Sequence, residues 1–295
     1  MAASLKFRLE AGLARVLLGL VARLPPAAAS TLGGIVARGI GPWLRVSRVA
    51  DANLRLTMPD LDAPARARII RGVWDNLGRT ACEFPHIRAL GPTPHGPGVE
   101  IVCDPARLAA FRAGGAVIFF SGHMANWEAM TPLLAQVGPR PGVFYRAARN
   151  PLVDRLIRTL RGASGIALFP KGAPGARAAM LHLRDGGQLG LLADQKMNDG
   201  IAATLFGQPA MTASAPAALA LRFGCPLVPV RVERLGPARL RVVIEPALVP
   251  PAGGDRHADV AALTQMVNDR LEAWIRARPA QWLWLHRRWP RELMQ

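Results

Sequence analysis

A histidine and a glutamate stand five residues apart, where an apolar run gives way to a helical pattern. The segment Ser121-Gly122-His123-Met124-Ala125-Asn126-Trp127-Glu128 follows the apolar residues 116–120. On an ideal helix this separation turns two side chains roughly 140° apart, so they converge only if His123 lies in a turn and Glu128 early in the helix. The carboxylate then holds the imidazole in one tautomer, as the acid of a catalytic triad does. Such a dyad deprotonates an external hydroxyl.

The elements that must position this pair follow a regular alternation. From residue 99 onward, short apolar runs alternate with helical patterns, which predicts an α/β fold with a mostly parallel sheet flanked by helices. The expected strands are 100–102, 116–120, 142–145, 166–169, 189–193, 226–232 and 240–245. The expected helices in this part are 108–113, 125–136, 151–161, 174–184, 213–223 and 257–277. A further helix is expected over 62–88, followed by a loop at 91–98.

Polar side chains follow three of these strands at the points where they end. Ligands of open α/β sheets bind beyond the carboxyl ends of the strands, so we expect these groups to meet at one rim. They are His123 after 116–120, Arg146 after 142–145, and Asp194 with Gln195 after 189–193.

Several of the candidate side chains also have ordinary structural explanations. Asn126 is suited to capping a helix as well as to binding a substrate, and Asp194 is suited to capping a turn. Arg161 is expected near a helix end, where the helix dipole favours a positive charge. The residues alone leave these alternatives open.

Other catalytic classes do not fit the residue spacing. His-x4-Glu is not the His-Glu-x-x-His spacing that places two metal-binding imidazoles on one helix face, so no metal site is expected. A Gly-x-Ser-x-Gly nucleophile elbow is missing, and Gly114-Gly115 precedes a strand rather than following it as a dinucleotide-binding turn would. The three cysteines are scattered and predict neither a disulfide framework nor a metal cluster.

The charge of the chain indicates an anionic partner. Thirty-seven Lys and Arg residues against twenty Asp and Glu give a net charge of +17. Tyr145 is the single tyrosine, and aromatic and basic residues do not interleave, which argues against a stacking surface for nucleic acid. We therefore expect a membrane surface and no nucleic acid.

Residues 1–50 are predicted to form a basic, proline-broken helical region that associates with a membrane, ahead of a catalytic domain over 51–295. Arg8, Arg15 and Arg23 interrupt its apolar residues, so no stretch is suited to spanning a bilayer. Arg8 and Arg15 share one helix face and aliphatic residues populate the other, the pattern of a helix that lies in the interface. The alternative is an ordinary amphipathic helix packed on the domain.

The motifs of the chain resemble those of the late acyltransferases of lipid A biosynthesis, the lauroyl/myristoyl acyltransferases. The resemblance covers most of the sequence. It is found in the segments 53–59, Gly122–Glu128, Tyr145-Arg146 with Asn150-Pro151, 161–165, Leu192–Gln195, 205–210 and the closing run Pro279-Ala280-Gln281-Trp282-Leu283-Trp284-Leu285-His286-Arg287-Arg288-Trp289.

The resemblance implies a glycerolipid-acyltransferase-like fold and an enzyme on the cytoplasmic face of the inner membrane, held peripherally or weakly anchored. It implies an acyl carrier protein or coenzyme A thioester as acyl donor and no tightly bound cofactor. The implied acceptor is an anionic lipid, and a lipid A precursor is the first candidate. By family analogy His123 is the base, Glu128 its partner and Arg161 a residue tied to activity. Asn126, Asp194 and Gln195 match the family in sequence and are expected to shape the pocket or place the acceptor.

The motifs do not separate acceptors, since similar acyltransferases act on other glycolipids such as phosphatidylinositol mannosides. Two further hypotheses remain: a non-catalytic basic protein that binds membranes, and a hydrolase that transfers the acyl chain to water.

Overall fold

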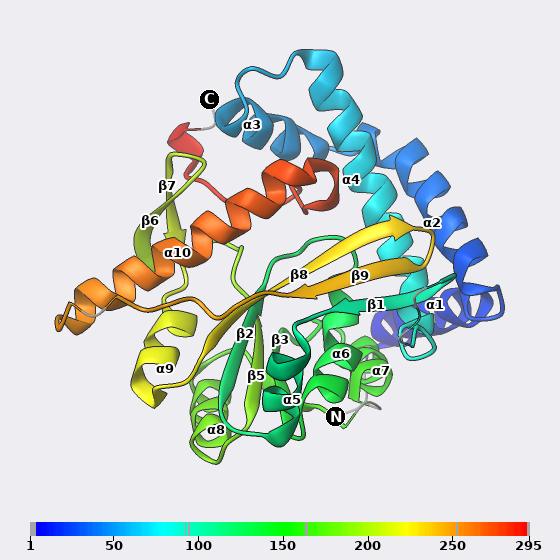
Figure 1. The fold of residues 1–295 in the computed structure, drawn as a ribbon. Coiled ribbons are helices and arrows are strands. Elements are labelled where there is room, and N and C mark those ends of the chain that lie inside the picture. Colours follow the sequence, from blue (N-terminus) through cyan, green and yellow to red (C-terminus); the bar gives the residue numbers. More distant parts are fainter. Residues whose placement is uncertain (1–3, 92, 94, 163–164, 252, 294–295) are drawn as a thin grey trace.

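A seven-stranded sheet forms the centre of the computed structural model, which describes residues 4–91, 93, 95–162, 165–251 and 253–293 (Figure 1). The strand order is β1-β9-β8-β2-β5-β3-β4, and neighbouring strands are parallel except β8 and β9. The strands are β1 (Gly98–Val102), β2 (Val117–Ser121), β3 (Pro141–Tyr145), β4 (Ala167–Pro170), β5 (Gln188–Leu192), β8 (Leu227–Gly236) and β9 (Arg239–Ile244).

Two apolar cores lie on opposite faces of this sheet. Every residue of the central strand β2 is buried, and its side chains alternate: Ile118 and Phe120 belong to one core, Val117 and Phe119 to the other. Helices α8 (Ala173–Arg184), α9 (Ala215–Phe223) and α10 (Arg256–Ala277) contribute to the first core, and α5 (Pro105–Ala113) and α6 (Met130–Val137) to the second. Burial on both faces explains why the strand sequences read as continuous apolar runs.

The N-terminal part of the chain is helical and covers one side of the molecule. It contains α1 (Leu5–Val21), α2 (Pro26–Ile40), a short 3-10 turn η1 (Gly41–Trp43), α3 (Ser47–Thr57), α4 (Ala63–Glu83) and the turn η2 (Phe84–His86). Helices α2 and α4 cross closely at two glycines. A Cβ on Gly33 would lie only 2.3 Å from the carbonyl oxygen of Gly78, so a larger residue at Gly33 would force the helices apart. Within the described residues, none of the helices combines the length and the apolar character needed to cross a bilayer.

The expected α/β architecture with its mostly parallel sheet is confirmed, with two local corrections. The helix expected over 125–136 starts later: residues Trp127–Ala129 form a 3-10 turn, η3, and α6 begins at Met130. An antiparallel pair, β6 (Ile201–Leu205) and β7 (Gln208–Thr212), was not expected and packs against α10. The remaining helix, α7, runs from Pro151 to Gly162. The division into regions 1–50 and 51–295 stays a prediction.

Candidate active site

The candidate site begins where β2 and β5 end side by side. The last residues of these two parallel strands, Ser121 and Leu192, are register partners, and the amide of Ala193 donates to the carbonyl of Ser121 at 2.8 Å. His123 and Asp194 each follow two residues beyond those ends. The expected meeting of these two side chains at one rim of the sheet is therefore observed.

His123 and Asp194 form a hydrogen-bonded pair. Nδ1 of His123 lies 2.8 Å from Oδ1 of Asp194, and the backbone N–H of His123 donates to Oδ2 at 2.8 Å. The indole N–H of Trp282 donates to the same Oδ2 at 2.7 Å. Asp194 is fully buried, whereas 16% of the His123 side chain is exposed. Since Nδ1 faces the carboxylate, the neutral imidazole presents an unprotonated Nε2 toward the open side.

The two groups shift each other's pKa in opposite directions. Burial lowers the pKa of His123, but the charge of Asp194 and the hydrogen bond to it outweigh burial, with a smaller contribution from Glu128, and the pKa is raised. Burial raises the pKa of Asp194, but the charge and hydrogen bonds of His123 dominate and hold this pKa well below its usual range. Asp194 is therefore an anion that stabilises the imidazolium, which is what a general base requires of its partner.

Glu128 does not form the predicted hydrogen bond to His123, and this expectation is corrected. Its carboxylate binds Arg161, which donates from Nε at 2.8 Å and from Nη2 at 2.5 Å. The indole of Trp127 links the two pairs, because its ring lies 5.1 Å from that of His123 and its N–H donates to Glu128 at 3.2 Å. The late start of α6 explains the difference, since Glu128 lies in the 3-10 turn η3.

The turn that holds His123 adopts a backbone conformation that needs support. Ala125 has φ of 46°, in the left-handed region that costs a non-glycine residue roughly 1–2 kcal/mol. The closing segment of the chain runs beside this turn: the amide of Ala125 donates to Gln281 at 2.8 Å, and the amide of Leu283 donates to His123 at 3.1 Å. The run 279–289, noticed in the sequence only as a family signature, thus fixes the active-site turn.

A second support, which we call the turn clamp, consists of Asn76, Thr80, Glu83 and Arg234. Asn76 and Thr80 both donate to the carbonyl oxygen of Ala125, at 3.0 Å each. Arg234 joins the three α4 residues: Nε donates to Asn76 at 2.8 Å, Nη2 to Thr80 at 3.1 Å, and Nη1 to Glu83. The clamp is deeply buried, with 7% of the Arg234 side chain and none of Glu83 exposed.

Asn126 belongs to this support and not to a substrate-facing surface: of the two roles left open by the sequence, the structure shows the helix cap. The side chain is completely buried. Its oxygen accepts from the amide of Glu128 at 3.2 Å, and its nitrogen donates to Glu83 at 2.8 Å. Asn126 therefore caps η3 and ties the active-site turn to the clamp.

The two other predicted binding residues remain near the rim. The amide nitrogen of Gln195 lies 3.4 Å from Nε2 of His123, on the side from which a hydroxyl must approach. Arg146 follows β3 and is exposed, and it forms no hydrogen bond or ion pair with another side chain in the described part of the protein. A contact of Arg146 with substrate stays a prediction.

Sequence reasoning did not identify the clamp or Trp282. One signal was present: Asn76, Thr80 and Glu83 recur at helical spacing on α4, so they share a face. A polar stripe on a helix that also has an apolar stripe indicates buried polar contacts. The partner Arg234 lies 151 residues from Glu83, and no local pattern connects them.

The N-terminal helix α1 lies against the site. It packs on α7, which carries Arg161, and on η2, where the Phe84 ring lies 5.8 Å from the Arg161 guanidinium. Asn150 at the start of α7 donates to the carbonyl of Phe7 at 2.9 Å and to Glu10 at 3.0 Å. The outer face of α1 is apolar and exposed: Leu5, Leu9, Leu13, Val16, Leu17 and Leu20 are each 53% exposed or more.

Comparisons with known proteins identify the family of the chain. The family model described as bacterial lipid A biosynthesis acyltransferase matches residues 9–291. The chain is 28% identical over 194 residues to phosphatidylinositol mannoside acyltransferase of Mycobacterium tuberculosis, which covers 63% of this chain and 58% of that protein. The protein of the same name from Mycolicibacterium smegmatis is 28% identical over 241 residues, 80% of this chain and 76% of that protein. The alignment thus spans less than two-thirds of the Mycobacterium tuberculosis relatives.

A strand-end histidine paired with a buried carboxylate, on a mostly parallel sheet, is an arrangement suited to general acid–base chemistry. The chain belongs to the bacterial lipid A biosynthesis acyltransferase family.

The described residues contain no group of three or more His, Cys, Asp or Glu side chains that could hold a metal ion. The arrangement instead offers one base at Nε2 of His123 and one partly free cation at Arg161. Within the described residues, Nη1 of Arg161 forms no hydrogen bond or ion pair, whereas Nε and Nη2 bind Glu128.

Proposed function

We propose that the protein transfers an acyl chain from a thioester donor to a hydroxyl group of an anionic glycolipid at a membrane surface. The observation that carries the proposal is the pair of His123 and Asp194 at the sheet rim, with the His123 side chain partly exposed. The apolar helix α1 packs on α7, the helix that carries Arg161. An acyl chain and a lipid hydroxyl are delivered from a membrane, and α1 presents exposed apolar side chains next to the helix that carries Arg161.

In the proposed mechanism, Nε2 of His123 accepts the proton of the acceptor hydroxyl, and the hydroxyl oxygen attacks the thioester carbonyl. Asp194 keeps the proton of the neutral imidazole on Nδ1 and stabilises the imidazolium that forms. The sulfur leaves as the thiol after it receives this proton. A positioned base of this kind typically accelerates a reaction about 10²- to 10⁴-fold.

Arg161 is proposed to donate to a substrate oxygen that gains negative charge. The backbone N–H groups of His123, Met124 and Ala125 already bind Asp194, Gly122 and Gln281, so they are not free for this task. Nη1 of Arg161 has no such bond to any residue that the structure describes, and Glu128 fixes the orientation of the guanidinium. A preorganised charged donor stabilises a developing oxyanion strongly in a site from which water is excluded.

Two acceptor classes are proposed. The family description favours a lipid A precursor, with the hydroxyl of a 3-hydroxyacyl chain as nucleophile. The names of the curated relatives favour a phosphatidylinositol mannoside as second candidate. The donor is proposed to be an acyl carrier protein or coenzyme A thioester, and the location the cytoplasmic face of the inner membrane, where the protein is held peripherally.

The test is acyl transfer by the purified protein with each acceptor in turn, with products identified by lipid mass spectrometry. We expect acylated lipid, and a loss of about 10²- to 10⁴-fold for His123→Ala with an unchanged circular dichroism spectrum and melting temperature. Near-normal turnover of that variant overturns the proposal. Release of free fatty acid in the presence of acceptor supports a hydrolase instead.

A further inference from the structure

A cavity of about 460 Å³ lies between the N-terminal helices, away from the pair of His123 and Asp194. It is lined by the end of α2, the turn η1, the start of α3 and the first half of α4. The lining residues that matter here are Arg38, Trp43, Arg48, Asp51 and Arg71. None of them contacts His123, Glu128, Arg161 or Asp194 through a hydrogen bond or ion pair.

The cavity has two unpaired positive charges. The guanidinium groups of Arg48 and Arg71 form no hydrogen bond or ion pair with another residue in the described part of the chain. Arg38 is only loosely engaged, since its Nη1 lies 3.6 Å from Asp75. Arginine is weakly hydrated and presents a planar set of donors that matches phosphate oxygens.

The one acidic residue that lines the cavity is already neutralised. Oδ2 of Asp51 accepts from Arg55 at 2.8 Å, and Oδ1 accepts from Arg66 at 2.8 Å. The hydroxyl of Ser47 is also occupied, since it donates to Gly41 and accepts from the indole of Trp74. Apart from the exposed indole N–H of Trp43, the side-chain donors left for a ligand are cationic, so the ligand they fit is an anion.

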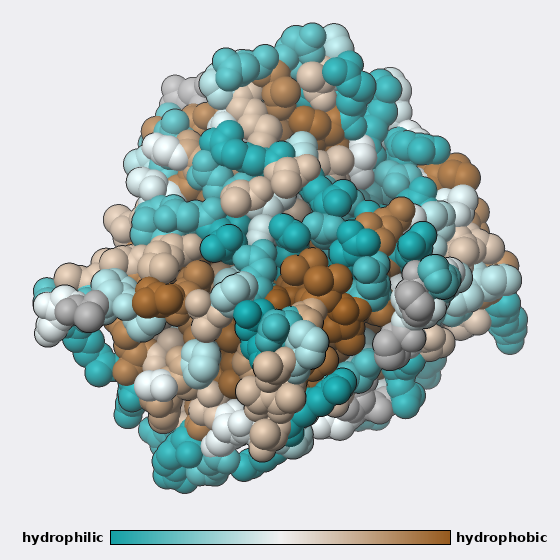
Figure 2. All heavy atoms as spheres, in the orientation of Figure 1, coloured by the Kyte–Doolittle hydropathy of each residue, from teal (hydrophilic) through white to brown (hydrophobic). Residues whose placement is uncertain are grey.

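The cavity opens beside exposed apolar side chains. Ile40 is 59% exposed, Trp43 88% and Leu44 46%, and they continue the exposed face of α2 that contains Leu32, Ile35 and Val36. Figure 2 shows apolar surface reaching the edge of the molecule where Figure 1 places α2, with hydrophilic residues around it. An exposed tryptophan beside aliphatic residues is typical of a segment at the level of lipid head groups.

We propose that this cavity binds the phosphate of an anionic membrane lipid, in addition to the lipids that react at His123. In this arrangement the apolar face of α2 enters the acyl-chain region of the bilayer and Trp43 lies at the level of the head groups. Arg48 and Arg71 donate hydrogen bonds to the lipid phosphate. Basic pockets next to a membrane surface recognise lipid head groups in this way. The inference rests on the membrane location proposed above, and it adds a binding site that fixes how the N-terminal helices meet the bilayer.

The experiment measures binding of the purified full chain to vesicles of phosphatidylcholine alone or mixed with phosphatidylglycerol. Arg48→Ala/Arg71→Ala should weaken binding to the anionic vesicles roughly 30-fold and leave the weaker binding to pure phosphatidylcholine unchanged. Trp43→Ala should weaken binding to both kinds of vesicle. Because Arg48 and Arg71 bond to no other described residue, their removal should not change the melting temperature.

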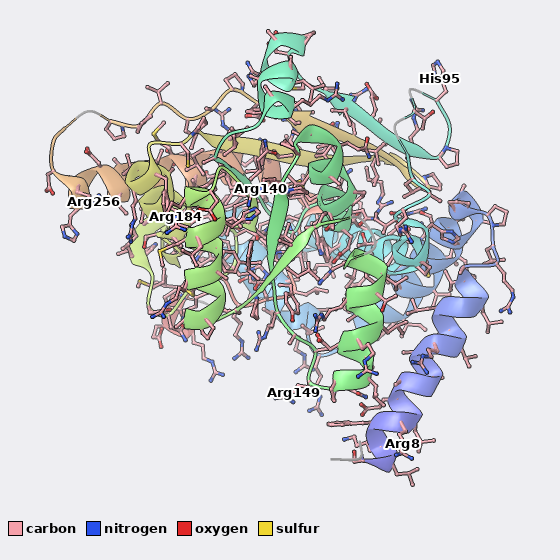
Figure 3. All side chains as sticks on the ribbon, turned by 90° about the horizontal axis from the view of Figure 1, so that it is seen from below. Arg8, His95, Arg140, Arg149, Arg184 and Arg256 are labelled. Atoms are coloured by element: carbon pink, nitrogen blue, oxygen red, sulfur yellow. The ribbon has the colours of Figure 1, made fainter. Side chains whose placement is uncertain are left out.

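The matched control removes the same charge elsewhere. Arg177→Ala/Arg256→Ala changes two exposed arginines on α8 and at the start of α10; Figure 3 shows Arg256 on the far side of the molecule from Arg8 of α1. We expect less than a two-fold effect. An equal loss in both double variants shows diffuse attraction and overturns the site. Inorganic phosphate should release the unaltered protein from anionic vesicles more than sodium chloride of equal ionic strength does, and equal release by the two salts also overturns the site.

Failure of this inference is distinguishable from failure of the proposed function. His123→Ala should retain vesicle binding and lose acyl transfer. Arg48→Ala/Arg71→Ala should retain transfer to an acceptor dispersed in detergent. If the double variant loses transfer in detergent as well, the cavity is part of the acceptor site and the separate lipid site is overturned.

Discussion

The active-site turn and the N-terminal helices are built on opposite principles. The turn is buried and held by hydrogen bonds from two directions, α4 and the run 281–283, and Arg234 fixes the α4 side chains that make them. These bonds maintain a left-handed Ala125. Helices α1 and α2 with η1 and Leu44 instead expose twelve large apolar side chains among the described residues. Exposed apolar side chains gathered on neighbouring positions of a helix are typical of surfaces that bind a partner or a membrane. We therefore propose that catalysis takes place in a region held rigid by its own hydrogen bonds. Membrane binding is proposed for the N-terminal helices, whose exposed apolar side chains a bilayer would cover.

The largest effect should come from the acid of the turn. Asp194→Asn should lower the rate on the plateau of the pH profile by about 10²- to 10⁴-fold, because the imidazole is no longer held in the tautomer that leaves Nε2 free. The acidic limb of kcat/KM should also move to lower pH. Below the folded-state pKa of His123 the base is protonated and activity falls. The charge of Asp194 raises that pKa, so replacing Asp194 with a neutral side chain lowers the pKa and moves the acidic limb to lower pH.

The matched variant is Glu128→Gln, since the charge of Glu128 raises the pKa of His123 less than that of Asp194 does. Its acidic limb should move less. A larger movement with Glu128→Gln than with Asp194→Asn would restore Glu128 as the partner of the base.

The second-largest effect is expected on the free energy of unfolding, and it tests whether the turn clamp is a main support of the fold around His123. Arg234→Ala leaves Glu83 as a buried unpaired charge and removes the donors to Asn76 and Thr80, so it should cost about 3–5 kcal/mol of unfolding free energy. Arg239→Ala removes an exposed arginine from the neighbouring strand and should change stability by roughly 0.5 kcal/mol or less. Urea denaturation measures both, and equal values would show that the clamp is not a main support.

The sequence predicted the rim because the ends of parallel strands meet at one edge, and this placed His123 and Asp194 together. It did not select the right acid. Five residues of separation favoured Glu128, whereas the left-handed Ala125 and the 3-10 turn η3 direct that side chain to Arg161. Selection of Asp194 depends on the register of Ser121 with Leu192, a tertiary fact. The clamp depends on a contact between α4 and β8, which local periodicity does not contain.

The third effect belongs to the outer helices. Leu13→Ser/Leu17→Ser should leave the melting temperature nearly unchanged, since these side chains are 61% and 53% exposed. Binding to phosphatidylcholine vesicles should weaken by about 2 kcal/mol, roughly 30-fold, because two partly buried leucines leave the bilayer. The control Leu181→Ser/Val249→Ser changes exposed apolar residues outside this region and should bind normally. Equal weakening in the control would show that the apolar face of α1 is not the docking surface.

The smallest effect measures how much strain the turn stores. Ala125→Gly removes a Cβ from a residue with φ of 46°, so it relieves roughly 1–2 kcal/mol of strain. The glycine also loses more chain entropy on folding, about 0.4–1 kcal/mol. Stability should therefore rise by about 0–1.6 kcal/mol, while kcat falls if the clamp alone does not hold His123 against Asp194. Loss of stability in this variant would mean that the buried Ala125 methyl contributes more through packing than the left-handed conformation costs. A higher melting temperature with a lower kcat would show that the strained conformation of Ala125 positions His123. A higher melting temperature with an unchanged kcat would show that the strain has no role in catalysis.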